Sequence, residues 1–296
     1  MYVVPLSSAV AVLGRGGCGS KAYELSAILH KGYTVPDGVV LTDAAYRRVL
    51  HHVSGAAEYL DDSLRVAPFP EDVLSEVVPA FEALVEVYES VSVRSSASAE
   101  DLADASFAGQ YETVLNVKTV DELLDAIKRC WLSLSDPRVH SYAAKKKMTL
   151  EDGRIALLIQ GMVRSEQAGV AFSIHPVTMT DTIVINASYG LGEAVVSGLV
   201  TPDTFEYDKK TGELHRDLGS KEVKIVLGER GVEERETSLA EQSQFCLSDE
   251  ETCTLAKIVQ RLESEYGNAV DVEFAFQKGQ LFILQVRPIT SLKGGL

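Results

Sequence analysis

The sequence contains little cysteine and no long apolar run. Its four cysteines form neither a CxxC pair nor a zinc-type cluster: they are Cys18, Cys130, Cys246 and Cys253. We expect free thiols in a reducing compartment. No apolar run reaches the roughly 20 residues that span a bilayer, and the N-terminus lacks the basic region of a signal peptide. These absences predict a soluble, cytoplasmic protein with no membrane partner.

Positive charge is also scarce. The chain has 28 lysines and arginines against 43 aspartates and glutamates, which gives a formal net charge of -15. A protein that binds nucleic acid normally carries a basic excess, so this balance argues against a nucleic-acid partner. It does not exclude an anionic small ligand, because a few local cations can form a phosphate pocket inside an acidic protein.

Length and periodicity predict the fold class. At about 100–200 residues per domain, 296 residues fit one large domain or two lobes. Helical spacing predicts helices at 19–31, 44–52, 70–90 with an interruption at Pro79, 119–132, 136–147 and 249–266. Short β-type runs dominate from residue 154, besides earlier ones at 39–41 and 91–94. The mixture predicts an α+β fold with one lobe over 1–155, a second over 156–292 and a tail over 293–296.

The first candidate site is Gly19-Ser20-Lys21, at the start of a predicted helix. Ser20 is the expected N-cap. Backbone N–H groups and the helix dipole favour an anion at this point, and the Lys21 ammonium adds a point charge for phosphate oxygens. Taken alone, the same residues fit a solvated lysine beside a helix cap.

The second candidate site is Arg94, at the end of a predicted strand. An arginine can hold a phosphate with two parallel hydrogen bonds. The stretch that follows, 95–109, is rich in Ser, Ala and Gly, which allows backbone N–H groups to approach a polyphosphate closely. The alternative is a flexible surface loop.

A third candidate is the segment Gln160-Gly161-Met162-Val163, which follows a strand and resembles a hinge between lobes. Adenine needs a flat apolar pocket with a few polar main-chain contacts, and such a segment can provide them. The alternative is a buried strand without a ligand.

The fourth candidate is a predicted hairpin near the C-terminus. Asp271 and Glu273 are two residues apart on one strand, and Gln285 and Arg287 are two apart on the next. Each pair therefore shares a face. Carboxylate and amide oxygens suit Mg²⁺, and an arginine beside them can bind phosphate. The alternative is a cross-strand surface salt bridge, which contributes little stability.

Together these segments resemble the ATP-binding domain of phosphoenolpyruvate synthases, pyruvate phosphate dikinases and rifampin phosphotransferases. The resemblance covers residues from about 14 to 291. It is carried by GSKAYELSAILHKGYTVPDGVVLT, VRSSASAEDLADASFAGQYETVLNV, QGMVRSEQAGVAFSIHPVT, NASYGLGEAVVSGLVTPDTF and VDVEFAFQKGQLFILQVRPIT, in the family's order. It implies an ATP-grasp-type fold, in which two lobes clasp a nucleotide.

The resemblance also implies roles for individual residues. Lys21 and Arg94 match phosphate-binding residues, and Arg287 matches an arginine that stabilises the transferred phosphoryl group, so these three are the expected catalytic residues. Glu273 and Gln285 match metal-coordinating positions for Mg²⁺. The further expected ATP contacts are Gln160, Met162 and Val163 around the adenine, Ser106, Gly109 and Gln110 in a loop over the phosphates, and Glu193 in the GLGE motif.

For the reaction, the resemblance implies that ATP pyrophosphorylates a histidine on a separate domain or subunit. The β-phosphate then reaches a small-molecule final acceptor, and AMP is released. The family's acceptor histidine lies in a Gly-Gly…Ser-His-Ala pattern, and no histidine of this sequence has that context. His175, in Ile-His-Pro, is expected to be structural.

Two other functions remain compatible with the motifs. One is a self-sufficient small-molecule kinase or ligase whose acceptor binds in the same cleft. The other is a non-catalytic nucleotide-binding module, which the full set of charged motif residues disfavours. The products separate the first alternative from the dikinase reaction, since ADP indicates a kinase or ligase and AMP with phosphate indicates a dikinase.

Overall fold

The structure is a computed structural model that describes residues 1–53, 64–97, 112–133 and 155–289. It divides into two compact units, Met1–Gly32 with Pro36–Met162, and Tyr33–Val35 with Val163–Leu296. The division follows Met162 and not residue 155, because the strand that begins at Ile155 pairs within the sheet of the first unit. Each unit combines antiparallel strands with helices, which confirms the α+β class.

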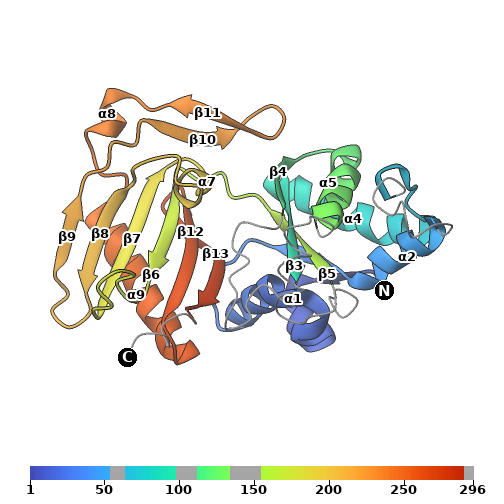
Figure 1. Cartoon of the computed structure of the whole chain (residues 1–296), viewed down its shortest axis with the longest axis horizontal. Coiled ribbons are helices and arrows are strands. Elements are labelled where there is room, and N and C mark those ends of the chain that lie inside the picture. Colours follow the sequence, from blue (N-terminus) through green and yellow to red (C-terminus); the bar gives the residue numbers. More distant parts are fainter. Residues whose placement is uncertain (54–63, 98–111, 134–154, 290–296) are drawn as a thin grey trace. The chain divides into compact units, whose positions relative to one another are not determined.

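Five antiparallel strands form the sheet of the first unit, in the order β1-β2-β5-β3-β4 (Figure 1). They are β1 (Val3–Pro5), β2 (Gly38–Leu41), β3 (Val91–Ala97), β4 (Thr113–Val117) and β5 (Ile155–Gly161). The runs expected at 39–41 and 91–94 are therefore strands. The strand expected to lead into the hinge segment is β5, which lies at the centre of the sheet.

Among the described residues, the helices of this unit include η1 (Leu6–Ser8, a 3-10 turn), α1 (Ala9–His30), α2 (Asp43–Val53), α4 (Glu71–Tyr88) and α5 (Val120–Leu132). The helix expected at 136–147 lies outside the described residues. α4 runs unbroken through Pro79, where an interruption was expected. Proline removes one helical N–H, but Pro79 and Ser75 are exposed, so water can bond the carbonyl left without a partner.

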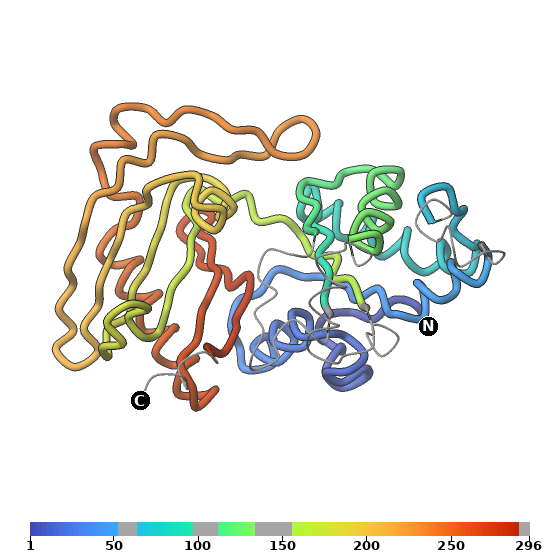
Figure 2. The backbone as a smooth tube through the Cα atoms, viewed as in Figure 1, coloured from blue at the N-terminus to red at the C-terminus, as the bar shows by residue number. Residues whose placement is uncertain are grey.

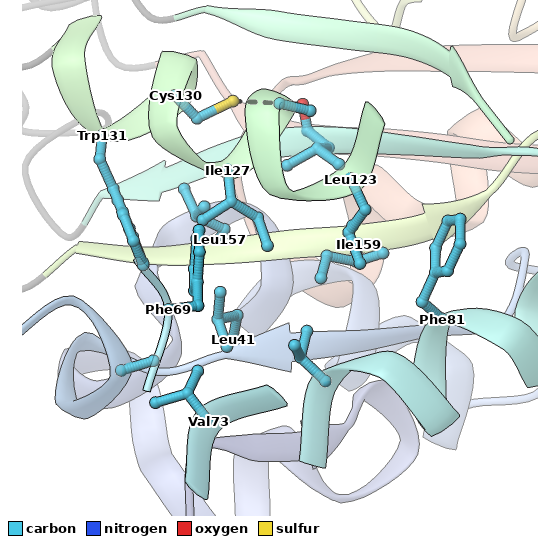
Figure 3. Close-up of a cluster of buried hydrophobic side chains, with 14 of the residues drawn as sticks. Leu41, Phe69, Val73, Phe81, Leu123, Ile127, Cys130, Trp131, Leu157 and Ile159 are labelled. Carbon is cyan, nitrogen blue, oxygen red and sulfur yellow. Dashed lines mark hydrogen bonds between the residues drawn. The ribbon is translucent and has the colours of Figure 1, made fainter. Parts of the chain in front are cut away.

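Alternation along the strands builds the core of the first unit. Leu41, Leu157 and Ile159 point to the face that α4 and α5 cover, where they pack with Phe81 and Trp131 (Figure 3). α1 packs against β3 and β5 from the other face. Both faces of the central strands are thus covered by helices.

The second unit contains a six-stranded antiparallel sheet in the order β13-β12-β6-β7-β8-β9. Its strands are β6 (Gln167–Phe172), β7 (Thr182–Tyr189), β8 (Asp203–Asp208), β9 (Leu214–Asp217), β12 (Val270–Gln277) and β13 (Gln280–Pro288). A separate ribbon pairs β10 (Val223–Leu227) with β11 (Val232–Glu236), and Figure 2 shows it in orange beyond one end of the sheet.

Three helices accompany these strands: α7 (Glu193–Val196), α8 (Leu239–Gln242) and α9 (Asp249–Tyr266). α9 packs on one face of the six-stranded sheet. The Ser173 hydroxyl donates to Glu263 of α9 at 2.9 Å, so Ser173 lies on the face that α9 covers. Val270, which is paired with Ser173, lies on the same face. The other face carries the polar side chains of β12 and β13.

A short segment near the N-terminus, Tyr33–Val35, belongs to the second unit. The Thr34 carbonyl accepts the N–H of Ile283 in β13 at 2.9 Å. The Tyr33 hydroxyl donates to Glu265 of α9 at 3.1 Å, and the Arg261 guanidinium lies over its ring. The chain therefore passes from the first unit to the second and back before it enters β2.

Within the described ranges, no helix has both the length and the apolar character that crossing a membrane would require.

Candidate functional site

Lys21 lies at the start of the regular part of α1. The backbone of α1 is non-helical at Gly14 and at Gly19, so the continuous helix begins at Ser20, close to the expected start at 19. The Lys21 ammonium donates to the Ser95 carbonyl of β3 at 3.1 Å. Lys21 is therefore held beside β3.

The cap of this helix differs from the expected one. Ser20 Oγ is buried and has no hydrogen-bond partner among the described residues. The hydroxyl of Ser96 takes that place: it accepts the N–H of Ala22 at 3.1 Å and donates to the Cys18 carbonyl at 2.8 Å. The expected N-cap at Ser20 was therefore wrong, because a residue from a neighbouring strand supplies the cap.

Gly19 makes this close contact feasible. Its φ is +73°, and a Cβ at this position would lie 1.8 Å from the Ser96 carbonyl oxygen. Gly14 has a similar φ of +61°, but a Cβ there would meet no atom of the described chain within 4 Å. Of these two glycines, only Gly19 is thus required both by backbone conformation and by packing.

Arg94 lies on β3 and is half-buried. Strand alternation places Arg94 on the same face as Ser96, which contacts α1. The first unit therefore brings Lys21 and Arg94 to the same side of β3. Three further expected contacts, Ser106, Gly109 and Gln110, lie outside the described residues.

The expected adenine segment begins in a buried strand. Gln160 is 2% exposed, and its side-chain amide donates to the Pro36 carbonyl at 3.1 Å. The N–H groups of Gly161 and Met162 donate to the Asp37 and Ser90 carbonyls at 2.9 and 3.0 Å. The side chain of Gln160 is thus engaged within the first unit, and its contact with a base stays a prediction.

Val163, the last residue of that segment, opens the second unit. It belongs to a small apolar cluster with Ala168 of β6 and Ala275 of β12, against which Phe282 and Leu284 of β13 pack. Met162 and Val163 are both buried, at 8% and 5% exposure. The chain thus leads directly from the central strand of one sheet to an apolar patch on the other.

The C-terminal hairpin has the pairing that alternation predicted. Asp271 is opposite Arg287, and Glu273 is opposite Gln285. We call the side of the six-stranded sheet that carries these four residues, opposite α9, the hairpin face. Arg287 bonds Asp271, with 2.5 Å between Nη2 and Oδ2. The four residues are therefore gathered on one surface of the second unit.

A β-bulge extends the hairpin face towards the apolar cluster. The β12–β13 register shifts between Glu273 and Phe274, which leaves Leu284 as an extra residue on β13. Leu284 and Phe282 consequently pack on the same face as Gln285. Without the extra residue, strict alternation would turn one of these side chains towards α9.

The surroundings of Asp271 on this face raise the pKa of its carboxyl group. Burial raises its pKa, the Arg287 guanidinium opposes that shift, and the Glu273 carboxylate adds to it. Asp271 Oδ1 is buried, and no group in the described part of the chain donates to it. A buried oxygen without a partner beside a second carboxylate is suited to a cation, which would supply the missing interaction.

Along β12, the side chains of the hairpin face change from apolar at Ala275 to acidic at Glu273 and Asp271. Ala275 is opposite Ala168 in the apolar cluster, Glu273 is opposite Val170, and Asp271 is opposite Phe172. At about 3.3 Å per residue, the span from Ala275 to Asp271 is about 13 Å. Apolar surface, oxygen ligands and the Arg287–Asp271 pair thus follow one another along one direction.

Glu193 lies at the apolar end of this arrangement. It is exposed, and it begins α7 directly after the turn that follows β7. That turn starts at Gly190, whose carbonyl accepts the Ser165 hydroxyl at 2.9 Å and whose N–H donates to the Glu166 carbonyl at 2.9 Å. Glu193 is thus attached to the segment that follows Val163.

Sequence reasoning missed one polar pair on the hairpin face. The Thr204 hydroxyl donates to Asn186 Oδ1 at 3.0 Å. The strand register places Asn186 opposite Val170, in the row of Glu273. The alternation of polar and apolar residues in β7 could have indicated this position.

His175 occupies a structural position. Its Nδ1 accepts the N–H groups of Val177 and Thr178 at 3.1 and 3.2 Å, and its Nε2 lies 3.7 Å from Glu206. The ring nitrogen with the free electron pair is therefore covered by two backbone donors. This geometry does not suit a phosphoryl acceptor, which needs that electron pair for nucleophilic attack.

Comparison with known proteins shows the family. The family model described as "Pyruvate phosphate dikinase, AMP/ATP-binding domain" matches residues 16–295. The chain therefore belongs to this family of nucleotide-binding domains, and the resemblance seen in the sequence is confirmed. The expected ATP ligand agrees with the description of the family.

Among curated proteins, the chain is 41% identical over 277 residues to the uncharacterized phosphotransferase YvkC of Bacillus subtilis, covering 93% of this chain and 33% of that protein. It is 39% identical over 279 residues to the phosphoenolpyruvate synthase of Pyrococcus furiosus, covering 88% and 33%. A probable phosphoenolpyruvate synthase of Methanothermobacter thermautotrophicus is 36% identical over 305 residues, with 94% and 44% covered. The chain thus spans less than half the length of these relatives.

Among solved structures, a D-alanine–D-alanine ligase from Bacillus anthracis is similar over 96% of this chain and 58% of its own, with 10% identity and a TM-score of 0.39. A likeness at this level carries no argument about function.

Proposed function

We propose that the chain is the ATP-binding component of a dikinase-type phosphotransferase, which cleaves ATP with Mg²⁺ and transfers a pyrophosphoryl group to a histidine on a separate domain or subunit. The ordered chemistry of the hairpin face carries the proposal. Apolar surface, oxygen ligands and an arginine follow each other there as base, metal and phosphates follow each other along ATP.

In the proposed complex, the adenine packs against Phe282 and Leu284, the half-buried side chains that cover the cluster of Val163, Ala168 and Ala275. This assignment makes Met162 and Val163 the base contacts, and Glu193 is proposed to bind near the ribose because its turn lies at the same end of the sheet. A flat apolar surface with a few main-chain polar groups is the usual environment of a purine.

Mg²⁺ would be held by Glu273 and Gln285, with Asp271 as a third oxygen donor. The fit rests on the donor set and on the buried Asp271 Oδ1 that lacks a partner within the described ranges. Magnesium is usually bound by one or two carboxylates together with substrate phosphates and water. When bound, the ion neutralises charge on the phosphates and aligns them.

Arg287 is proposed to stabilise the group in transfer. In the described structure it is 30% exposed and bonded to Asp271. A metal ion bound by Asp271 would compete for that carboxylate and release the guanidinium towards a phosphate. Lys21 and Arg94 of the first unit are proposed to bind phosphate oxygens as well.

The proposed reaction breaks the bond between the β-phosphorus and the oxygen that bridges it to the α-phosphate. A new bond forms between the β-phosphorus and a histidine nitrogen of the partner, and AMP leaves with the bridging oxygen. Phosphoryl-transfer catalysis depends on alignment and charge neutralisation more than on covalent chemistry by the protein. A small molecule is the proposed final acceptor, and the cytoplasm, where ATP is available and thiols stay reduced, is the proposed location.

Incubation with ATP labelled at the β- or γ-phosphate, with and without a candidate histidine-domain protein, tests the proposal. We expect label from both positions on the partner, and AMP as the nucleotide product. ADP as the product would indicate the self-sufficient kinase or ligase instead. Arg287→Ala should abolish turnover and keep most of the affinity for ATP, and unchanged turnover would contradict the role of Arg287.

A further inference from the structure

A fully buried ion pair lies in the second unit, away from the hairpin. Asp203, at the start of β8, and Lys221, just before β10, are both 0% exposed, and Lys221 Nζ lies 2.5 Å from Asp203 Oδ1. Burying two charges costs solvation free energy, which is offset only when each charge has further hydrogen bonds. A pair in this position therefore needs its complete set of partners.

The partners of the pair come from three separate segments. Asp203 accepts the N–H of Gly219 at 2.9 Å and the N–H of Cys246 at 2.7 Å. Lys221 Nζ also donates to the Gly219 carbonyl at 2.9 Å, and the Lys221 N–H donates to the Thr201 carbonyl at 3.2 Å. The pair thus fixes the chain on both sides of the β10–β11 ribbon to the start of β8.

Strand β10 also contacts the Gly190–Glu193 turn. Ile225 forms a parallel bridge with Gly190, and its carbonyl accepts the N–H of Leu191 at 2.8 Å. Gly190 has a φ of +78°, and a Cβ there would lie 2.3 Å from the Ile225 carbonyl oxygen. The backbone of the turn is therefore seated directly on β10.

We propose that the Asp203–Lys221 pair is a positioning clasp, which fixes β10 and through it the Gly190–Glu193 turn at the base-and-ribose end of the hairpin face. This inference rests on the proposed function, since it names that turn as a nucleotide contact. The clasp touches no ligand itself. It sets the place of Glu193 and leaves the metal and phosphate groups of the hairpin unaffected.

The second unit offers a matched control. Lys209 is 7% exposed and bonds Glu263 at 2.5 Å and Asp181 at 2.8 Å. It lies just after β8, at the end of the sheet away from Gly190. Lys209→Met removes a nearly buried lysine of the same unit without touching β10.

The test uses the 296-residue chain and two probes, adenosine and magnesium tripolyphosphate, titrated by calorimetry. In Asp203→Asn/Lys221→Met, adenosine affinity should fall by about 10–100-fold, the range found when residues that orient a ligating side chain are lost. Tripolyphosphate affinity should change by less than about twofold, well below that range. Lys209→Met should leave both affinities unchanged. Equal loss of both probes in the double variant, or no loss of adenosine, would overturn the clasp.

Hydrogen exchange on the unaltered protein provides a second measurement, which does not depend on the variant folding. The amides of Gly219 and Cys246 report the clasp, and the amide of Leu191 reports the turn. If the clasp holds the turn, the three should share one opening free energy. Much faster exchange at Leu191 would show that the turn moves independently and would refute the inference. If the unaltered protein binds neither probe, the proposed function fails, while this exchange result still decides whether the clasp holds the turn.

Discussion

Replacing Gly19 by alanine should destabilise the first unit far more than replacing Gly14. Both glycines have a φ near +60 to +75° and an extended ψ, a region that only glycine adopts readily, and the backbone penalty for alanine is about 1–3 kcal/mol. At Gly19 the new Cβ would also lie 1.8 Å from the Ser96 carbonyl oxygen. Since a backbone atom is in the way, α1 and β3 must separate.

That separation has an additional cost that can be worked out from the contacts. It breaks the two hydrogen bonds of the Ser96 hydroxyl, to Ala22 and to Cys18, each contributing about 0.5–1.5 kcal/mol. Gly19→Ala should therefore cost about 1–3 kcal/mol more than Gly14→Ala, or about 2–6 kcal/mol in total.

The single tryptophan makes the measurement specific to the first unit. Trp131 is 1% exposed and packs in the core of that unit. Urea unfolding followed by its fluorescence gives the free energy of unfolding for Gly19→Ala, Gly14→Ala and the unaltered chain. Equal losses in the two variants would refute the packing argument, because only the shared backbone penalty would then be real.

Three further predictions concern other parts of the chain. Burial raises the pKa of Asp271 in the folded state, so the protonated carboxyl group contributes fully to stability below its ordinary pKa, and this contribution is lost as the pH rises through the raised pKa. The free energy of unfolding in urea should therefore fall between about pH 3 and 7, and Asp271→Asn should remove this pH dependence. Burial raises the pKa of the Cys130 thiol to about 12 and also raises that of Cys246, so a thiol reagent should label half-buried Cys253 first, and early labelling of either buried cysteine would contradict the structure. Ser248→Ala removes the capping box of α9 and should cost about 1 kcal/mol in the free energy of unfolding measured in urea, and an unchanged value would contradict the role of this cap.

The hairpin face could be predicted because it depends on one local rule. Side chains two residues apart on a strand share a face, and this rule alone placed Asp271 with Glu273 and Gln285 with Arg287. The packing of both Phe282 and Leu284 on this face could not be read in the same way. It depends on the extra residue Leu284, and alternating sequences show no distinct signal for a bulge.

Features set by distant segments were not predictable from local patterns. Lys221 and Asp203 are 18 residues apart, and a charged residue type at either position gives no local sign of complete burial. Ser20 had the residue type of an N-cap, but the cap came from Ser96 in another element. In both cases the hydrogen-bond partner comes from a segment that is distant in sequence and is brought close by the packing of strands and helices. A helix-cap or charge pattern contains information only about its own segment.

The early passage of Tyr33–Val35 through the second unit has a consequence for dividing the molecule. A fragment that starts at Val163 would lack the Thr34 carbonyl that bonds β13 and the Tyr33 ring that Arg261 covers. The edge of β13 would then present an unsatisfied N–H at Ile283, beside the residues proposed to bind the metal. Neither unit is a continuous stretch of polypeptide. A C-terminal fragment that begins at Val163 would therefore expose the edge of β13, and exposed strand edges are prone to self-association.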